Sequence, residues 1–482
     1  MFSALQTRLT RSVLLTAAFL SFQYSMAEEV AAPDTTAGRL LAGWIEFMNS
    51  RVDSQAARFN PSAFRDKTQE AAQSRMQFRK RGLELFGTLE LTRVLAENGR
   101  EITGVLSAKD GRQILLTLYL TPRPENLIDA VKLEPYRGED AALAPAEQSD
   151  TELVERASVL MKRAEEQGFS GAVLLARASE PVFAQAYGLA NRSYRIPNTL
   201  KTKFNLGSMN KMFTAVAVMQ LVEREKLSLN DHISKYLDET WIPQKVSRTI
   251  QVKHLLSHSS GLGNYFNETF EQSARTRFRN TSDYKVLLSD ETLAFLPGSS
   301  WRYSNTGFLL LGAIIEEIAG VSYDEYVRKN IYIPAGMNSS GCFDLDVPNE
   351  NIAFGYWNDR GKLRNNLFLH VIKGGPAGGG YSTVGDLLKF SESLTSGKLL
   401  TLESTRELVT PKPRSPSYGY GFEINRSPSG LMVGHSGGFP GIEAHFSILL
   451  DKSITLIVLC NADESVGLVL DELRGLAASV KN

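Results

Sequence analysis

The sequence of 482 residues predicts an α+β protein of two domains, and three observations lead to this fold class. Apolar runs that end in charged residues are typical of buried helices. Segments in which apolar and polar residues alternate are typical of antiparallel strands. A stretch rich in Ala, Pro and acidic residues at 137–150 is typical of a linker. We therefore expect a small N-terminal α+β domain at 35–136 and a larger domain at 151–482, in which helices flank an antiparallel sheet.

The first 27 residues have the composition of a secretory signal peptide. Arg8 and Arg11 precede an apolar segment at 12–20, and Ser25-Met26-Ala27 supplies the small residues that signal peptidase needs. We expect cleavage after Ala27 and a periplasmic or secreted mature protein. The apolar segment is too short for a stable membrane span, and an uncleaved anchor is the alternative interpretation.

The N-terminal domain begins with helical patterns at 40–48 and 64–85 and continues as alternating strands. Asn98-Gly99 and Asp110-Gly111 predict hairpin turns between these strands. The pattern indicates two or three helices against a curved antiparallel sheet, and it resembles the cone-shaped fold of nuclear transport factor-like domains. We find no catalytic motif in this domain.

Three short elements follow one another in the larger domain, and their residue types suit a serine nucleophile. They are Ser208-Met209-Asn210-Lys211, Tyr303-Ser304-Asn305 and His435-Ser436-Gly437. Ser-x-x-Lys also occurs at 282–285, and Tyr-x-Asn also occurs at 265–267 and 356–358. These copies lack the apolar run that follows Ser208 and Tyr303. We therefore interpret Ser282 as a solvated helix start and the other copies as surface or rim residues.

Ser208 precedes an apolar run at 212–222 that predicts a mostly buried helix. Residues three apart share a helix face, so the Lys211 amine is expected beside the Ser208 hydroxyl. Burial lowers the pKa of a lysine, and an uncharged Lys211 can activate Ser208 for attack on a carbonyl. An ordinary helix start is the alternative interpretation.

Tyr303 ends a turn and precedes a second apolar helix at 307–315. A cationic lysine nearby favours the anionic form of a phenol, so we expect Tyr303 to accept and return protons. Asn305 offers an amide to a substrate carbonyl.

His435 opens a segment that predicts a strand, in which Gly437 and Gly438 allow a ligand to approach the backbone. We expect the amides of Ser208 and Gly438 to stabilise the oxyanion that forms when Ser208 attacks. For His435 the alternative interpretation is a hydrogen-bonded histidine at a strand end.

The order and context of these motifs resemble those of the serine hydrolase superfamily of penicillin-binding proteins and class C β-lactamases, which includes DD-carboxypeptidases, family VIII esterases and D-aminopeptidases. Further similar segments lie at 168–173, 186–192, 254–262, 375–379 and 418–422. The resemblance implies a β-lactamase/transpeptidase-like antiparallel sheet flanked by helices, with an all-helical subdomain and no cofactor. It implies that Ser208 is acylated, that Lys211 and Tyr303 shuttle protons, and that Asn305 orients the substrate.

The third motif departs from the Lys-Thr-Gly of many β-lactamases, because His435 and Ser436 stand there. This departure argues against a β-lactamase, because a histidine version is similar to that of some DD-carboxypeptidases, D-aminopeptidases and esterases. We favour a cell-wall peptidase such as a DD-carboxypeptidase or a carboxylesterase about equally, then a D-amino-acid peptidase, with a β-lactamase behind them. The loops at 265–279 and 374–381 are expected to form the pocket walls. A non-catalytic module that binds peptidoglycan fragments or acts as a scaffold is the alternative from another class.

The remaining features indicate neither a metal nor a nucleic-acid partner. The chain has 53 basic and 53 acidic residues. His254 and His258 have a spacing compatible with zinc but lack a third ligand, so we expect structural loop histidines. Cys342 and Cys460 are expected as small buried thiols, and a disulfide between them stays open. We also expect a final helix at 464–480 beside the helix at 151–167, on one face of the sheet.

Overall fold

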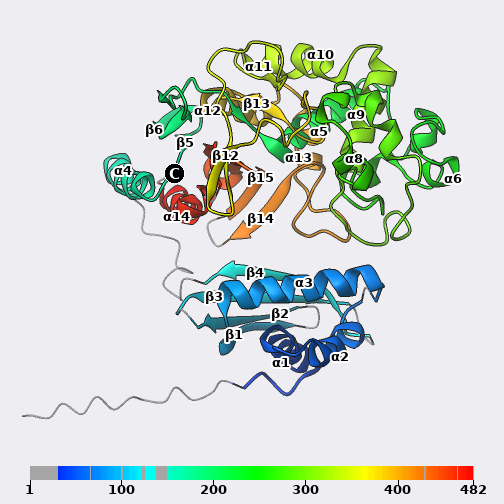
Figure 1. The fold of residues 1–482 in the computed structure, drawn as a ribbon, viewed down its shortest axis with the longest axis vertical. Coiled ribbons are helices and arrows are strands. Elements are labelled where there is room, and N and C mark those ends of the chain that lie inside the picture. Colours follow the sequence, from blue (N-terminus) through cyan, green and yellow to red (C-terminus); the bar gives the residue numbers. More distant parts are fainter. Residues whose placement is uncertain are drawn as a thin grey trace, which may run out of the picture. The chain divides into compact units, whose positions relative to one another are not determined.

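The computed structural model describes residues 31–65, 67–98, 101–109, 111–121, 125–136, 149–427, 430–463 and 465–480. The expected signal peptide, Gly99, Asp110 and most of the linker at 137–150 lie outside the described residues. The chain divides into two compact units between Ala141 and Ala142, and each unit is described by itself (Figure 1).

The N-terminal unit packs helices against a four-stranded antiparallel sheet of order β1-β2-β3-β4. Its elements are α1 (Thr36–Asn49), α2 (Asp53–Ala63), α3 (Gln69–Phe86), β1 (Leu89–Asn98), β2 (Glu101–Ala108), β3 (Gln113–Leu120) and β4 (Ile128–Pro135). Trp44 and Phe47 of α1 are buried in one core with Ile102 and Leu116 of the sheet. This is the α+β architecture that the alternating pattern predicted.

One helix boundary in this unit was predicted wrongly. The helical pattern at 64–85 was expected to begin at Phe64, but Phe64 instead ends α2 in an extended conformation. Its backbone forms a bridge with Ile128 of β4, and its side chain is buried. The sheet contact therefore decides the conformation of Phe64, and α3 begins only at Gln69.

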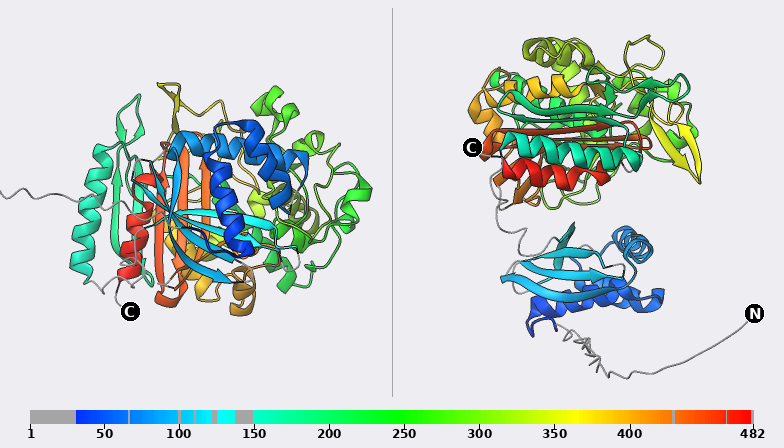
Figure 2. Two further views of the ribbon diagram at one scale, coloured as in Figure 1. Left: turned by 90° about the horizontal axis from the view of Figure 1, so that it is seen from below. Right: turned by 90° about the vertical axis from the view of Figure 1, so that its left-hand side faces the viewer.

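The larger unit is built on a six-stranded antiparallel sheet of order β14-β15-β16-β17-β5-β6. The strands are β5 (Gly171–Arg177), β6 (Glu180–Tyr187), β14 (Glu423–Ser427), β15 (Gly430–Phe439), β16 (Ile442–Leu449) and β17 (Ile454–Cys460). On one face, α4 (Asp150–Glu166) and α14 (Leu470–Ser479) lie side by side and share an apolar core with the sheet (Figure 2). The sequence predicted this pair, although α14 begins at Leu470 and Glu464 lies outside the described residues.

The other side of the sheet carries the helices that position the site. Within α5 (Asn210–Glu223), every residue from Asn210 to Leu221 is buried, as expected for a helix that is apolar all round. It packs against α9 (Asn305–Ala319) in the largest core of the unit. Further helices are α6 (Gln244–Ser247), α7 (Val252–Leu256), α8 (Glu268–Gln272), α10 (Tyr323–Val327), α11 (Ile333–Ala335), α12 (Val384–Thr395) and α13 (Leu402–Leu408).

Short strands complete the unit and bring distant segments together. β9 (Phe204–Asn205), β10 (Gly341–Cys342) and β13 (Gly380–Ser382) form a three-stranded sheet next to Ser208. β7 (Leu189–Asn191) pairs with β8 (Ile196–Pro197), and β11 (Tyr356–Asp359) pairs with β12 (Lys362–Asn365). The predicted fold class, an antiparallel sheet flanked by helices together with a helical region, is confirmed.

Within the ranges given above, no single helix has the length and apolar character needed to cross a membrane. One bent pair of segments, Asn305–Ala319 with Tyr323–Ala335, meets these criteria only when the two are taken together.

Candidate active site

Ser208 lies in a tight turn that the backbone of Gly207 makes possible. Gly207 has a φ of +52°, and a Cβ atom there would lie 3.0 Å from the Gly438 amide nitrogen. The side chain of Asn205 accepts a hydrogen bond from Gly207 N at 2.9 Å and fixes the turn. A 3₁₀ turn, Gly207–Met209, then leads into α5, so Ser208 precedes a rigid, buried helix.

The Lys211 amine has three hydrogen-bond partners. Its Nζ atom lies 2.7 Å from Asn305 Oδ1, 2.5 Å from the Ala377 carbonyl oxygen and 3.2 Å from Ser208 Oγ. Lys211 is fully buried, and this desolvation lowers its pKa well below the ordinary value. An uncharged amine has two N–H groups for the two acceptor oxygens. Its lone pair is then left for the Ser208 hydroxyl.

Tyr303 lies beside this amine, with its ring centroid 4.9 Å from Lys211 Nζ. The sequence led us to expect a phenol whose anionic form is favoured by a cationic lysine. The structure differs, because burial raises the pKa of Tyr303, and a hydrogen bond with Ser208 offsets this only in part. Burial therefore disfavours both the charged form of Lys211 and the anionic form of Tyr303, and the neutral phenol can donate a proton.

Behind Tyr303, a buried hydrogen-bonded chain joins two histidines through Tyr418. Ser304 N donates to His258 Nδ1 at 3.1 Å, so the proton of His258 is on Nε2, which lies 3.1 Å from the Tyr418 hydroxyl. Tyr418 therefore donates to His435 Nε2 at 2.9 Å, and His435 Nδ1 donates to the Ser436 carbonyl at 2.5 Å. Burial lowers the pKa of both histidines, in agreement with this neutral arrangement.

The place of His258 and Tyr418 in the site was not predicted from the sequence. The ring of His258 packs on Tyr303 with centroids 4.3 Å apart, so it supports the phenol directly. His254, by contrast, accepts a hydrogen bond from Gln251 N, and burial lowers its pKa to about 4. No group of three metal-binding side chains exists among the described residues, so the zinc interpretation has no support there. The available signal was the presence of His258 in the segment 254–262, which the resemblance already singled out.

The third motif lies on β15, next to Ser208. A Cβ atom at Gly437 would lie 1.9 Å from the Leu206 carbonyl oxygen and 3.2 Å from Ser208 N, so only glycine fits. At Gly438 a Cβ atom would meet nothing, which places this residue on the open side of the strand. The backbones of Gly438 and Ser208 therefore lie close together at an accessible position.

A cleft of about 110 Å³ opens onto Ser208. Its polar lining includes Asn305, and its walls are largely apolar and aromatic, with Tyr265, Phe266, His370, Val371, Phe439 and Ile442. None of the described residues that line it is an acid, a lysine or an arginine. The predicted wall segments contribute Tyr265, Phe266 and the stretch 377–379, whereas His370, Val371, Phe439 and Ile442 were not predicted.

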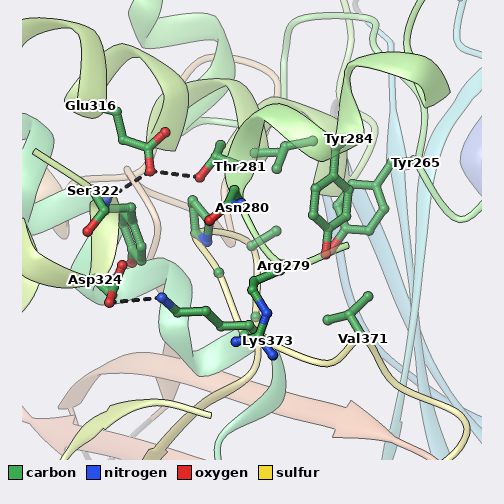
Figure 3. Close-up of a pocket in the computed structure, with 17 residues that line it drawn as sticks. Tyr265, Arg279, Asn280, Thr281, Tyr284, Glu316, Ser322, Asp324, Val371 and Lys373 are labelled. Carbon is green, nitrogen blue, oxygen red and sulfur yellow. Dashed lines mark hydrogen bonds and ion pairs between the residues drawn. The ribbon is translucent and has the colours of Figure 1, made fainter. Parts of the chain in front are cut away.

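A second, polar cavity lies on the other side of the loop at 373–378 (Figure 3). Lys373 pairs with Asp324 at 3.0 Å, and Glu316 accepts hydrogen bonds at 2.9 Å from Thr281 Oγ1 and from Tyr323 N. Tyr265, Ala377 and Gly378 line both cavities. The loop thus carries Ala377, the acceptor of Lys211, between two cavities.

Other residues that the sequence singled out lie elsewhere. Ser282 is exposed, and Lys285 donates to Thr240 Oγ1, as expected for a solvated helix start. Tyr356 was expected at the surface or the rim but is buried, and its hydroxyl accepts a hydrogen bond from Arg192 N. Cys342 and Cys460 are both free thiols.

The comparisons with known proteins agree with this architecture. The Beta-lactamase family model matches residues 155–479, more than half of the chain, so the chain belongs to this family. "Penicillin-binding protein 4*" of Bacillus subtilis is 29% identical over 319 residues, which cover 62% of this chain and 70% of the relative. Teichoic acid D-alanine hydrolase of Staphylococcus aureus is 29% identical over 287 residues, which cover 57% of this chain and 66% of the relative.

Solved structures show the same fold. A penicillin binding protein from Bacillus halodurans matches with a TM-score of 0.61 and 31% identity, over 66% of this chain and 98% of that chain. A D-stereospecific amidohydrolase from Streptomyces sp. matches with a TM-score of 0.55 and 25% identity, over 65% of this chain and 94% of that chain. The predicted superfamily is confirmed, and the protein is a serine hydrolase.

Proposed function

We propose that this serine hydrolase cleaves an ester or amide bond through an acyl-enzyme on Ser208. The observation that supports this most directly is the buried Lys211 amine, whose Nζ atom lies 3.2 Å from the Ser208 hydroxyl oxygen. In the first step Lys211 takes the Ser208 proton while Ser208 Oγ forms a bond to the substrate carbonyl carbon. The carbonyl π electrons move to its oxygen, which becomes the oxyanion.

The oxyanion is held by the amides of Ser208 and Gly438, whose backbones lie together at the accessible end of the site. Collapse of this intermediate expels the leaving alcohol or amine, which receives a proton from Lys211 or from Tyr303. The neutral state of Tyr303 supports the role of proton donor. A water molecule then repeats the attack, releases the acid and restores Ser208.

The other motif residues have supporting roles in this proposal. Asn305 orients the substrate with its amide while its Oδ1 atom holds Lys211. Gly437 allows β15 to approach Ser208, and His435 fixes the strand through Tyr418. Ser436 is exposed on the same strand and contacts the substrate.

For the substrate, a cell-wall peptide or a carboxylic ester are the two leading candidates, followed by a D-amino-acid amide and a β-lactam. The aromatic lining of the cleft supports an apolar group on the substrate. The names of a teichoic acid D-alanine hydrolase and a D-stereospecific amidohydrolase among the similar proteins support D-aminoacyl esters and amides. Export through residues 1–27, and a cone-shaped fold of the N-terminal unit, are part of the same proposal.

The test is the intact mass of the purified protein after exposure to a fluorophosphonate and, separately, to a penicillin. A single adduct that is lost in Ser208→Ala supports the acyl-enzyme. Adducts with both reagents favour a cell-wall peptidase, and an adduct with the fluorophosphonate alone favours an esterase or D-amino-acid amidase. If neither reagent labels the protein, the alternative of a non-catalytic module that binds peptidoglycan fragments or a partner takes its place.

A further inference from the structure

The outer edge of β15 is open next to Ser208. β14 pairs with β15 only along residues 430–434, whereas residues 435–439 pair with β16 alone. Ser436 and Gly438 are exposed on this stretch, and Gly437 packs against the turn that holds Ser208. Gly438 also lines the cleft that opens onto Ser208, so this open edge adjoins the cleft.

An acidic side chain stands at the corner where the edge opens. Glu423 is the first residue of β14 and pairs with Gly434. Its Oε1 atom accepts a hydrogen bond from Ser436 Oγ at 2.6 Å and lies 3.5 Å from His435 Nδ1. The Glu423 side chain is 41% exposed, so a ligand can reach it. Ser436 lies two residues before Gly438 on β15, so their Cα atoms are about 7 Å apart.

The charge of Glu423 is not balanced by the catalytic groups. Burial lowers the pKa of Lys211, His258 and His435 and so disfavours a positive charge on each of them. The negative charge of Glu423 also raises the pKa of Lys211, Tyr303 and His435, although this effect is smaller than that of burial.

We propose that Glu423 and Ser436 form a recognition site for a positively charged amine, so that the substrates are esters or amides that carry a free ammonium group. An ammonium group at the open edge of β15 would pair with the Glu423 carboxylate and donate to Ser436 Oγ. A substrate carboxylate at the same place would be repelled. This inference rests on the proposed function, because it concerns a substrate that acylates Ser208.

The test compares three fluorophosphonates that differ only at the end of a pentyl tail, which is an ammonium group, an acetamide or a carboxylate. The labelling rate constant of each is measured by intact mass. We expect the ammonium reagent to label the protein about fivefold faster than the acetamide reagent, and the carboxylate reagent to be slower. High salt should reduce this preference, because the site is partly exposed.

Glu423→Gln keeps the oxygen that accepts from Ser436 and removes the charge. In this variant the ratio of the ammonium rate to the acetamide rate should fall to about one, and in Glu423→Lys the carboxylate reagent should become the fastest. The ratio within one variant cancels any general change in reactivity. Glu392→Gln, an exposed site on α12, removes the same charge away from β15 and should retain the preference.

Two failures can be distinguished. If the acetamide reagent labels Ser208 but the three rates are equal in the natural protein, or unchanged in Glu423→Gln, the amine site is excluded and the proposed function stands. If none of the three reagents labels the protein, the proposed function fails together with this inference.

Discussion

The Lys211 amine lies 2.5 Å from the carbonyl oxygen of Ala377, although 166 positions separate the two residues in the sequence. This contact makes the loop at 373–378 part of the proposed catalytic machinery. The carbonyl takes one N–H of the amine and Asn305 Oδ1 takes the other. Both acceptors therefore help to direct the lone pair of Lys211 at Ser208.

Lys211→Arg should abolish labelling by a fluorophosphonate at every pH, because a guanidinium stays protonated and cannot accept the Ser208 proton. We expect a loss of roughly 10²–10⁴-fold in the labelling rate, the range for a general base. In the unmodified protein the rate should rise with pH through one ionisation. Its pKa should lie well below the ordinary lysine value, because burial favours the neutral amine.

The measurement is the labelling rate between pH 5 and 10, with Lys389→Arg on α12 as the control. Lys389 pairs with Asp386 through a side chain that is 47% exposed, and its replacement should leave the profile unchanged. A profile that titrates near the ordinary pKa of lysine would contradict the neutral amine.

Tyr418→Phe should destabilise the protein and slow acylation. The substitution leaves His258 Nε2 and His435 Nε2 without the hydroxyl that joins them, and both atoms are buried. Each unpaired buried group costs about 1–3 kcal/mol in the free energy of unfolding. Denaturant unfolding followed by fluorescence measures this loss, and the fluorophosphonate labelling rate reports the displacement of Tyr303 through His258.

Tyr420→Phe is the matched control, because Tyr420 lies two residues along the same segment and its ring packs under Lys412. This variant should retain both stability and labelling. Equal losses in the two variants would mean that the segment as a whole, and not the hydrogen-bonded chain, is responsible.

The motifs Ser208–Lys211 and Tyr303–Asn305 could be found from the sequence because each precedes a long apolar helix. Helix periodicity then places Lys211 beside Ser208 without any tertiary information. The sheet and the packing of α14 beside α4 were also predictable, since apolar alternation and helix pattern report local burial.

What the sequence did not reveal depends on long-range contacts. His258 and Tyr418 meet only because the loop after α7 lies against the segment that precedes β14, so their shared hydrogen bond has no local signature. The direction of the pKa shift of Tyr303 differs from the expectation for a related reason. The expectation used a cationic Lys211, whereas the burial that lowers the pKa of Lys211 and raises that of Tyr303 comes from segments distant in the sequence.

Lys373→Met should slow acylation by releasing the loop that carries Ala377. The ion pair with Asp324 holds the start of this loop, and Asn210 and Thr214 of α5 hold it further along through the carbonyls of Gly375 and Pro376. We expect a severalfold lower labelling rate, and a loss of about 1 kcal/mol or less in the free energy of unfolding, because the pair is partly exposed.

Lys389→Met removes a comparable ion pair on α12 and should leave labelling unchanged. Equal rates in Lys373→Met and the natural protein would show that the hydrogen bonds from α5 suffice.

Acid should destabilise the larger unit through His445, a fully buried histidine of β16. Burial first, then the positive charge of Arg474, and last the electrostatic interaction with His435 where that group is protonated, lower its pKa to about 3 from an ordinary value of 6.5. The unfolded chain therefore binds a proton near pH 6.5 that the folded protein does not bind until about pH 3. The contribution of His445 is complete above pH 6.5 and is lost progressively as the pH falls toward 3.

Between pH 6.5 and 4.5 this loss amounts to roughly 2 kcal/mol in the free energy of unfolding. His445→Gln cannot titrate, and its amide can still bond to Ser447 Oγ, the partner of His445 Nε2 at 3.1 Å. Urea unfolding at pH 7 and pH 4.5 should therefore show a smaller acid-induced loss in this variant than in the natural protein. His232→Gln is the control, because His232 lies at an exposed turn before a 3₁₀ helix and its removal should leave the acid-induced loss unchanged. If His445→Gln and His232→Gln show the same acid-induced loss as the natural protein, the acid sensitivity does not originate in the burial of His445.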